Sequence, residues 1–364
     1  MKKSFIIPII FALVGTSFVS YSFLDTFIIP KNAKSVSFNY ENLDAPLGPI
    51  VPSTSQPQSS SASSQSSVSS STSTPVVQQK QYYEDLTAEQ IASLFTQNKT
   101  FVEKKHYSDS DIYIDITTHR DSEDTTTYYV ADIRINNMKF FRTAFAEDKY
   151  VENGEGERTS DICKRHKGIL AIDGDTYGQQ EAGYVIRNKT TYRRTKNLSR
   201  KKDEDLAIYD DGTFEIIDEN NTSIESLEAK GAREVFSFGP GLINAHEVTV
   251  TPKDEVGTAL SGNRNQRCAI GIIAPGHYCF VVSDGRNKDS SGISLYTLAN
   301  IMKDLHCETA YNLDGGGSAT MYLDDGTGNA NGLGHLINVP GQLQGDSRVQ
   351  QRKVSDIVYI GKDE

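Results

Sequence analysis

The chain has 364 residues, of which 37% are hydrophobic and 23% charged, and its formal net charge is −11. The acidic balance comes from 48 Asp and Glu residues against 37 Lys and Arg residues, with no long basic run. We therefore expect no nucleic-acid partner, because such binding depends on clustered positive charge. An anionic substrate would have to be held by a few placed arginines and not by the overall field.

Residues 1–30 are predicted to hold an uncleaved signal anchor. Lys2 and Lys3 precede an almost uninterrupted apolar stretch from Phe5 to Phe23. Its length is close to the roughly 20 residues that a membrane-spanning helix needs. The lysines favour an inside N-terminus, so we expect a single-pass protein of the cell membrane with its C-terminal domain extracellular. A secreted protein with a cleaved signal peptide is the alternative, although the apolar stretch is long for one.

Residues 31–81 are predicted to be a disordered stalk. From Pro52 to Pro75 the segment is dominated by Ser, Thr, Gln and Pro and has no aromatic or charged residue. Such a segment cannot bury enough apolar surface to offset the entropy of ordering it. The remaining residues, 82–364, are enough for one sizeable domain, which the stalk would hold away from the membrane.

In chain order, this domain is expected to open with a short helix. Thr87 and Gln90 have the spacing of a capping box, and an apolar stripe begins at Ile91. The segments DIYIDITTH, TYYVADIRIN and MKFFRTAFA are strand-like, because they alternate or are rich in aromatic and β-branched residues. A polar stretch over residues 152–160 then leads to another apolar strand, GILAID.

Short β-type segments dominate the rest of the domain. YDDGTF predicts a hairpin at an Asp-Gly turn, and IIAPGHYCFVV predicts another that turns at Pro275 and Gly276. One clear helix is predicted over residues 295–305, with Ser294 as its N-cap. The segments TAYNLD, SATMYLDDGTG and VSDIVYIG predict further strands. We therefore predict an α+β fold of mixed, mainly antiparallel sheets with few helices.

Three consecutive glycines, residues 315–317, follow Asp314 between two apolar segments. Without Cβ atoms they allow positive φ and the close approach of a ligand, and successive N–H groups would form an anion-binding nest. A β-hairpin loop is the alternative, although a hairpin needs fewer glycines. Asn312 and Asp314 are two positions apart and should share a face, where they would serve sugar hydroxyls, a reacting centre or an Asx turn.

Two other strand ends carry candidate residues. Asp173 and Asp175 follow an apolar strand, and paired carboxylates perform acid–base chemistry, bind a hard cation such as Ca²⁺, or cap a turn. Asp284 ends the segment CFVV, and Arg286 follows it, where arginine would bind a phosphate or form a surface ion pair. Arg267, just before the segment CAIGII, is assigned to the same rim.

The cysteines and the missing motifs restrict the alternatives. Cys163, Cys268, Cys279 and Cys307 are widely scattered and form no CxxC pair, which argues against a zinc site. Export would permit disulfides, but we expect at least two of the cysteines to be small buried apolar residues. The chain contains no GxSxG and no HExxH motif, so serine hydrolases and zinc proteases of those types are excluded.

The segment NLDGGGSATM, preceded by SDGR and GISLYTLANIM, resembles the phosphodiester glycosidase family, which includes N-acetylglucosamine-1-phosphodiester alpha-N-acetylglucosaminidase. FSFGPGLI, RCAIGI and RKVSDIVYIG are similar to other blocks of that family, and the resemblance covers residues 112–361. AIDGDTYG is similar to a further block, in which Asp173 stands where the family usually has Asn and Thr176 replaces an aromatic residue. Bacterial members often follow a membrane anchor, and many are associated with exopolysaccharide.

The resemblance implies hydrolysis of a sugar-1-phosphodiester at its C1–O bond. The leaving group is then a phosphate ester, which departs readily and needs little help from a general acid. In this reaction Asp314 would be the base or nucleophile that faces C1, and Asp175 the second carboxylate. Asp284 would orient the arginines or position the sugar.

A set of binding residues is assigned to this reaction from the residue types. Arg286 and Arg267 would bind the phosphate, and Asn312 would position the sugar. The remaining residues assigned to the substrate site are Gly315, Gly316, Gly317, Ser318, Asp173 and Thr320. Because ionised Asp only accepts hydrogen bonds where Asn also donates, Asp173 would alter the sugar specificity or the active site itself.

Two other functions are kept as alternatives. One is a non-catalytic glycan-binding domain, and the other is a metal-dependent phosphodiesterase that cleaves P–O with Asp173, Asp175 and Asp284 as ligands. The sequence establishes no cofactor, and a divalent cation such as Ca²⁺ is the one candidate. The expected partners are the membrane and a GlcNAc-like sugar phosphodiester in a cell-wall or exopolysaccharide glycan.

Overall fold

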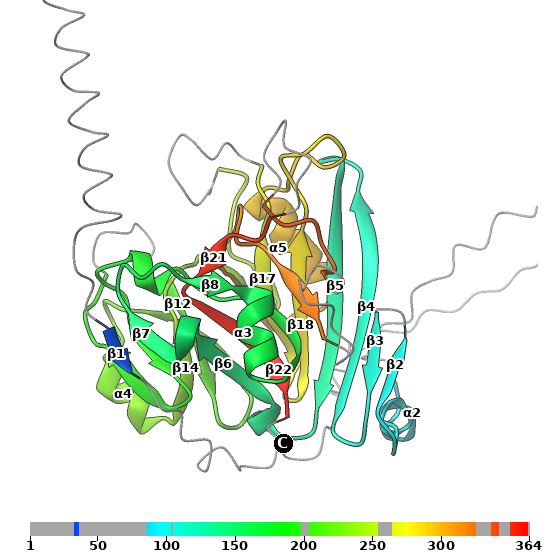
Figure 1. Cartoon of the computed structure of the whole chain (residues 1–364), viewed down its shortest axis with the longest axis horizontal. Helices are drawn as coiled ribbons and strands as arrows, with labels where there is room; N and C mark the ends of the chain where they lie inside the picture. The colour runs from blue at the N-terminus through cyan, green and yellow to red at the C-terminus, as the bar shows by residue number, and fades with distance from the viewer. Residues whose placement is uncertain are drawn as a thin grey trace, which may run out of the picture.

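The computed structural model describes residues 33–35, 86–102, 105–197, 204–253, 264–324, 336–341 and 350–362. In these segments every strand pair is antiparallel. Four short α-helices, α2 to α5, accompany the strands in the described part of the chain. The α+β fold class with few helices is therefore confirmed, and Figure 1 shows how strands make up most of the domain.

The predicted anchor, residues 1–30, lies outside the described residues. In the part that is described, no helix is long and apolar enough to cross a membrane. Of the predicted stalk, residues 31–81, the structure describes Ala33–Ser35, which form strand β1 and pair with β7 (Lys149–Val151). The anchor, the stalk and their boundaries therefore remain predictions.

The largest sheet has nine strands in the order β16-β15-β19-β17-β18-β5-β4-β3-β2. Its two longest strands, β4 and β5, lie side by side along one flank of the domain (Figure 1). The predicted alternation is confirmed in β4, where Ile112, Ile114 and Ile116 all face the core. In sheet order the strands are β16 (Glu247–Val248), β15 (Gly241–Asn244), β19 (Thr309–Asn312), β17 (Cys268–Ala274), β18 (His277–Ser283), β5 (Thr126–Ile135), β4 (Ile112–Asp121), β3 (His106–Ser108) and β2 (Thr100–Val102).

Two smaller sheets, of four and five strands, accompany the nine-stranded sheet. The four-stranded sheet has the order β20-β9-β22-β6, and the five-stranded sheet has the order β11-β10-β14-β12-β13. Both predicted hairpins are confirmed: YDDGTF joins β12 to β13, and β17 turns into β18 at Gly276, which has φ +82°. The bounds are β20 (Met321–Leu323), β9 (Gly168–Asp173), β22 (Asp356–Gly361), β6 (Phe141–Phe145), β11 (Thr190–Arg193), β10 (Val185–Arg187), β14 (Ala232–Phe236), β12 (Glu204–Tyr209) and β13 (Phe214–Asp218). A further pair joins β21 (Lys353–Val354) to β8 (Glu157–Arg158).

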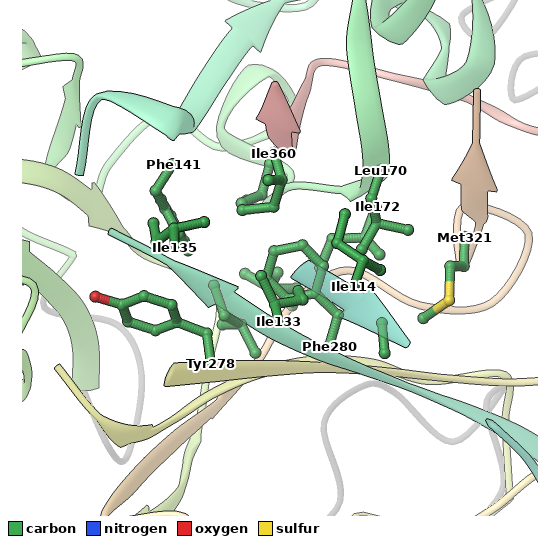
Figure 2. Close-up of a cluster of buried hydrophobic side chains, with 14 of the residues drawn as sticks. Ile114, Ile133, Ile135, Phe141, Leu170, Ile172, Tyr278, Phe280, Met321 and Ile360 are labelled. Carbon is green, nitrogen blue, oxygen red and sulfur yellow. The ribbon is translucent and has the colours of Figure 1, made fainter. Parts of the chain in front are cut away.

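The main hydrophobic core lies between the nine-stranded and four-stranded sheets (Figure 2), and β12, β13 and β14 of the five-stranded sheet also contribute side chains to it. Ile133 and Phe280 point into it from the large sheet, and Leu170 and Ile172 point into it from β9. Because side chains alternate along a strand, the large sheet also presents a second apolar face on its other side. There Val281 of β18 belongs to a separate buried cluster with residues of helix α5.

Helices cover the outer faces of the sheets. Helix α5 (Leu295–Asp304) packs on the nine-stranded sheet, α3 (Thr159–Arg165) on the four-stranded sheet and α4 (Ile224–Ala229) on the five-stranded sheet. The predicted helix start at Ser294 is confirmed, because its side chain accepts the Thr297 N–H. The capping box at Thr87 and Gln90 opens α2 (Ala88–Leu94), also as predicted.

The short helices α3 and α4 were not predicted. They contain seven and six residues, respectively, and α3 begins inside the stretch that was interpreted as a polar loop. Two turns or fewer give too little periodicity to be distinguished from a loop. Three single-turn 3₁₀ helices are also present in the described chain: η4 (Met138–Phe140), η5 (Ala146–Asp148) and η6 (Tyr177–Gln179).

Candidate active site

Several strands end at one place, where backbone hydrogen bonds join segments that are far apart in the sequence. The Asp314 N–H donates to the Gly174 carbonyl, just beyond β9, with N and O 3.1 Å apart. The Gly316 N–H donates to the Gln266 carbonyl, just before β17, at 3.0 Å. The Arg352 N–H, just before β21, donates to the Gly317 carbonyl at 3.1 Å. The segment after β19 is thus the centre around which the others gather.

The triple glycine lies in the segment that crosses from one sheet to another. The strand before it, β19, belongs to the nine-stranded sheet, whereas the strand after it, β20, belongs to the four-stranded sheet. The hairpin alternative is therefore wrong, because the two strands do not pair with each other. The crossover has to pass tightly between the ends of other strands, which explains its small residues.

The three glycines meet different constraints. A Cβ atom on Gly315 would lie 2.7 Å from the backbone oxygen of Gln266, closer than such contacts occur. Gly316 has φ +61°, and a Cβ atom there would lie 3.1 Å from Nη2 of Arg286. At Gly317 the nearest atom to a new Cβ would be 3.4 Å away, an ordinary contact. The backbone therefore requires the first two glycines but not the third.

We expect Gly316→Ala to destabilise the domain by about 1–2 kcal/mol, since a left-handed backbone conformation costs a residue with a Cβ about that much. It should also lower kcat/KM, because the new methyl group would displace the Arg286 guanidinium. Gly317→Ala is the matched control and should change the unfolding free energy by less than about 0.5 kcal/mol. Urea unfolding and initial rates would measure both effects. Equal effects of the two substitutions would show that the left-handed position is not what matters.

The N–H groups of the first two glycines do not form the predicted anion nest. Gly315 N–H donates to Asp314 Oδ1 at 2.7 Å, and Gly316 N–H is bound to Gln266. The Ser318 N–H donates to the Gly315 carbonyl at 3.2 Å. These N–H groups are already bonded to acceptors in the crossover or just before β17, because buried backbone groups need hydrogen-bond partners. They are therefore not directed at a bound anion. What the glycines contribute is space for two arginine side chains.

Two exposed arginines, Arg286 and Arg352, face this crossover. Arg352 Nη2 donates to Asp314 Oδ2 at 2.8 Å, and its Nε donates to Ser318 Oγ at 2.7 Å. Arg286 Nε donates to the amide oxygen of Asn265 at 2.6 Å. Partial desolvation and then the positive charge of Arg352 lower the pKa of Arg286. Within the described residues no carboxylate pairs with Arg286, so the two cations together are suited to bind an anion.

Asp173 lies beside Asp314, and its surroundings favour the neutral form of its carboxyl group. Its side chain is wholly buried, and its Oδ1 accepts the Thr320 N–H at 3.0 Å. Burial, and then the negative charge of Asp314, raise the pKa of Asp173 well above its usual range. In the described part of the chain no cationic side chain contacts it, so protonation is the way to avoid a buried unpaired charge. The two carboxyl groups thus differ, since Asp314 is paired with Arg352 and Asp173 is not.

Residues 166–361, more than half of the chain, match the family model of phosphodiester glycosidases. The chain belongs to the phosphodiester glycosidase family. Its fold is similar to that of the zebrafish N-acetylglucosamine-1-phosphodiester alpha-N-acetylglucosaminidase (NAGPA) catalytic domain, which was solved auto-inhibited by its pro-peptide. The two share 21% sequence identity with a TM-score of 0.51, over 70% of this chain and 83% of that one.

Two further proteins are similar to this chain over smaller parts of its length. A hypothetical protein from Synechocystis aligns with a TM-score of 0.44 and 16% identity, over 69% of this chain and 62% of that one. The SPbeta prophage-derived uncharacterized protein YomE of Bacillus subtilis (strain 168) is 26% identical over 178 residues, which are 48% of this chain. The match covers 27% of the length of YomE, so this chain corresponds to about a quarter of that relative.

The preference of Asp173 for its neutral form is relevant to the comparison with the Asn that the family usually has at this position. A protonated carboxyl group has an O–H that donates a hydrogen bond, as the amide of Asn does. Asp173 in this phosphodiester glycosidase domain is therefore closer in chemistry to the usual Asn than an ionised Asp would be. The change in specificity expected from Asp173 remains a prediction.

Asn312 and Thr320 lie close to the crossover and are almost wholly buried. Asn312 Nδ2 donates to the Gly239 carbonyl at 2.8 Å. Within the described residues, Asn312 Oδ1, Thr320 Oγ1 and Asp173 Oδ2 have no hydrogen-bond partner. Because these three atoms are buried, a substrate does not reach them in this structure, and the binding roles of Asn312, Thr320 and Asp173 remain predictions.

Asp284 and Arg267 were predicted at the rim of the site, but both are buried and their described contacts point inward. Asp284 accepts the Val339 N–H at 2.7 Å and the Tyr129 hydroxyl at 3.2 Å, and burial raises its pKa to about 6. Arg267 Nε donates to the Ile293 carbonyl at 3.3 Å. Asp284 therefore fastens the segment around Val339 beside the site, which is a different task from orienting the arginines.

Asp175 is not brought to Asp314. Its carboxylate accepts the Tyr177 and Ser237 N–H groups, each at 3.0 Å, and pairs with Nη2 of Arg187 at 2.9 Å. The carboxyl group next to Asp314 is instead that of Asp173, which ends β9, whereas Asp175 lies two positions beyond that strand. The geometry thus gives no support to Asp175 as the second catalytic carboxylate, and its contacts indicate a structural role.

The ligands expected for a metal-dependent phosphodiesterase do not converge. Asp173, Asp175 and Asp284 each bind different partners, as described above. Across the segments that the structure describes, no group of three or more His, Cys, Asp or Glu side chains is arranged to hold a metal ion. The observed grouping of acids and arginines instead suits an organic anion.

Two residues of the site were missed by sequence reasoning. Arg352 lies 38 positions after Asp314, in the segment RKVSDIVYIG, and its distance along the chain hides its contact with the crossover. Asn265 lies just before Arg267 and holds the Arg286 guanidinium. A basic residue shortly before the last strand of a family block was the available signal for Arg352. For Asn265 the sequence has no signal.

Proposed function

We propose that this domain hydrolyses the C1–O bond of a sugar-1-phosphodiester. The proposed sugar is GlcNAc-like, within a cell-wall or exopolysaccharide glycan. The observation that carries the proposal is the pair Arg286 and Arg352 on one side of the carboxylate of Asp314. Two guanidinium groups suit a phosphodiester anion, and an adjacent carboxylate suits the positive charge that develops at C1. Membership of the phosphodiester glycosidase family supports the same class of substrate.

In the proposed reaction the two arginines hold the phosphate while the C1–O bond breaks. The electron pair of that bond stays on the phosphate oxygen, which is a weak base and needs no strong acid beside it. Asp314 either accepts a proton from the water that attacks C1 or bonds to C1 itself, after which water releases the sugar. Arg352 holds the Asp314 carboxylate in place through the contact between its Nη2 and Oδ2. The raised pKa of Asp173 favours its neutral form, in which it adds no second negative charge.

The products of UDP-GlcNAc hydrolysis test this proposal directly. Cleavage at C1–O releases GlcNAc and UDP, whereas cleavage of the P–O bond releases GlcNAc-1-phosphate and UMP. We expect the first pair, with a rate that a chelator such as EDTA leaves unchanged. GlcNAc-1-phosphate formed in an EDTA-sensitive reaction would replace this proposal with the metal-dependent phosphodiesterase. Binding of glycan without turnover of UDP-GlcNAc or a simpler GlcNAc-1-phosphodiester would favour the binding module.

Arg286→Ala is expected to lower kcat/KM for a sugar-1-phosphodiester by about 100-fold or more, since one charged contact to the departing phosphate is lost. A phosphate-free glycoside of the same sugar should be affected far less. Arg194→Ala is the matched control, because Arg194 is 53% exposed and pairs with Glu225 on the surface. Parallel rate measurements on the two substrates decide the matter. Equal losses on both would remove Arg286 from the phosphate site.

We also propose that the domain lies on the extracellular side of the cell membrane. This rests on the apolar stretch within residues 1–30 and on the polar composition of residues 31–81. Protease added to intact cells should then cut the stalk and release the domain. Full protection of the domain in intact cells would contradict this location, and its recovery from the medium without protease would favour a cleaved signal peptide.

A further inference from the structure

All four cysteines are buried, but two of them meet. Cys279 lies in β18, and Cys307 lies between α5 and β19. Their Sγ atoms are 3.4 Å apart. Sulfur atoms in a disulfide are about 2.05 Å apart, so a shift of roughly 1.4 Å would bring the two into bonding distance. Cys163 and Cys268 belong to two other buried clusters.

The contact between the two sulfur atoms occupies a place where a third residue has no side chain. Gly271 of β17 is paired directly with Cys279 in the sheet. A Cβ atom on Gly271 would lie 2.6 Å from Sγ of Cys307 and 3.2 Å from Sγ of Cys279. Any other residue at this position would push the sulfur atoms away. Met302, whose Cε is also near, has a flexible side chain that can adjust as the sulfur atoms move.

We propose that Cys279 and Cys307 form a disulfide bond while the domain folds. The chemistry is two successive exchanges with a small disulfide such as oxidised glutathione. Cys279 or Cys307 first displaces one glutathione thiol, and the other cysteine then displaces the second. Two protein thiols and one glutathione disulfide thus become one protein disulfide and two glutathione thiols. An extracellular location supplies such oxidants, although the bond itself does not depend on the proposed glycosidase activity.

The bond has to form before the two sulfur atoms are buried. In the folded domain, the contact with Cys307 and then burial raise the pKa of Cys279. The thiolate, which is the reactive form, is therefore disfavoured there. The folded reduced protein should react slowly with oxidised glutathione, and refolding in its presence should be the efficient route.

The ring that the bond closes is long and contains part of the candidate site. Cys279 and Cys307 are 28 positions apart, and Arg286 and helix α5 lie between them. A cross-link over a loop of this length restricts the unfolded chain and stabilises the fold. We expect the oxidised protein to have a Tm about 5–10 °C above that of the reduced protein.

The test uses the full chain, denatured, reduced and refolded in detergent with reduced and oxidised glutathione. Of the four cysteines, two should react with a thiol reagent after denaturation, and all four after added reductant. Mass spectrometry should find the Cys279 peptide joined to the Cys307 peptide. Four free thiols after refolding, or a bond that involves Cys163 or Cys268, would overturn the proposal.

Two variants sharpen this result. In Cys163→Ala the bond should still form and leave one free thiol. In Cys279→Ser the Tm should no longer depend on reductant. Because Cys279→Ser could also impair folding, the thiol count of the unmodified chain is decisive by itself.

Discussion

Asp314→Asn is expected to lower kcat/KM on a sugar-1-phosphodiester by about 100- to 10,000-fold, the usual range for loss of a general base. Asparagine has nearly the same shape, and its amide oxygen can still accept the Gly315 N–H that now bonds to Oδ1. It carries no charge, however, and it can neither take a proton from water nor bond to C1. The effect should therefore appear in kcat.

The fold should tolerate this substitution. Arg352, the partner of Asp314, has a side chain that is 48% exposed, so water can replace the lost carboxylate. The unfolding free energy should change by no more than about 2 kcal/mol, because Arg352 is half-exposed although the Asp314 side chain is only 12% exposed. Asp161→Asn is the matched control, because Asp161 is 43% exposed and pairs with Arg158 on the surface. Initial rates and thermal unfolding of both variants give the comparison. Activity within a few-fold of the unmodified enzyme would make Asp314 a turn residue and end the proposed mechanism.

Arg187→Met is expected to destabilise the domain by about 3–5 kcal/mol, the usual cost of breaking a buried ion pair. Arg187 is wholly buried, with Nη2 2.9 Å from Asp175 and Nε 2.7 Å from Asp356. Its guanidinium carbon also lies 4.1 Å from the centre of the Phe236 ring. Removing it leaves two buried carboxylates without their cation. Urea unfolding at pH 7 measures the loss.

The loss should be smaller at low pH. In the folded protein burial alone would lower the pKa of Arg187, but Asp175 and Asp356 raise it, so Arg187 stays charged. Burial raises the pKa of Asp356 even beside Arg187, and loss of the Arg187 charge would raise it further. Such groups destabilise the fold increasingly as pH rises from their unfolded pKa towards their folded pKa. We therefore expect the deficit to be larger at pH 8 than at pH 5.

Arg194→Met is the matched control for this substitution. Arg194 is 53% exposed, and its salt bridges are with Glu225 and Glu228 on the surface. The control should lose less than about 1 kcal/mol, with little dependence on pH. Similar losses in the two variants would show that the buried cluster does not stabilise the fold.

The buried group formed by Arg187, Asp175 and Asp356 also positions the candidate site. A Cβ atom on Gly174 would lie 2.3 Å from Asp356 Oδ1, so the backbone here packs directly on the cluster. The Gly174 carbonyl in turn accepts the Asp314 N–H. The two acids at the end of β9 therefore have separate roles. Asp175 pairs with the buried Arg187, whereas Asp173 lies next to Asp314.

Local features of the fold were predictable because they depend on residues within one or two turns of each other. The capping box at Thr87 and the N-cap at Ser294 are contacts over three positions, and both are confirmed. Strand alternation and Asp-Gly or Pro-Gly turns are equally local, and the hairpins they predict are present. Helices α3 and α4 were missed because they are too short to show a period.

By itself, the sequence determined the α+β class, the main strands and the importance of the segment around Asp314. Asp314, the triple glycine and Arg286 could be singled out because their residue types are unusual at the ends of apolar strands. Only the tertiary structure decided which partners they meet. It makes the glycines a crossover between two sheets, brings Arg352 to Asp314 from 38 positions away, and separates Asp173 from Asp175. The physical reason is that these pairings depend on the order of strands in the sheets and on which charges are buried together, and neither is encoded in local spacing.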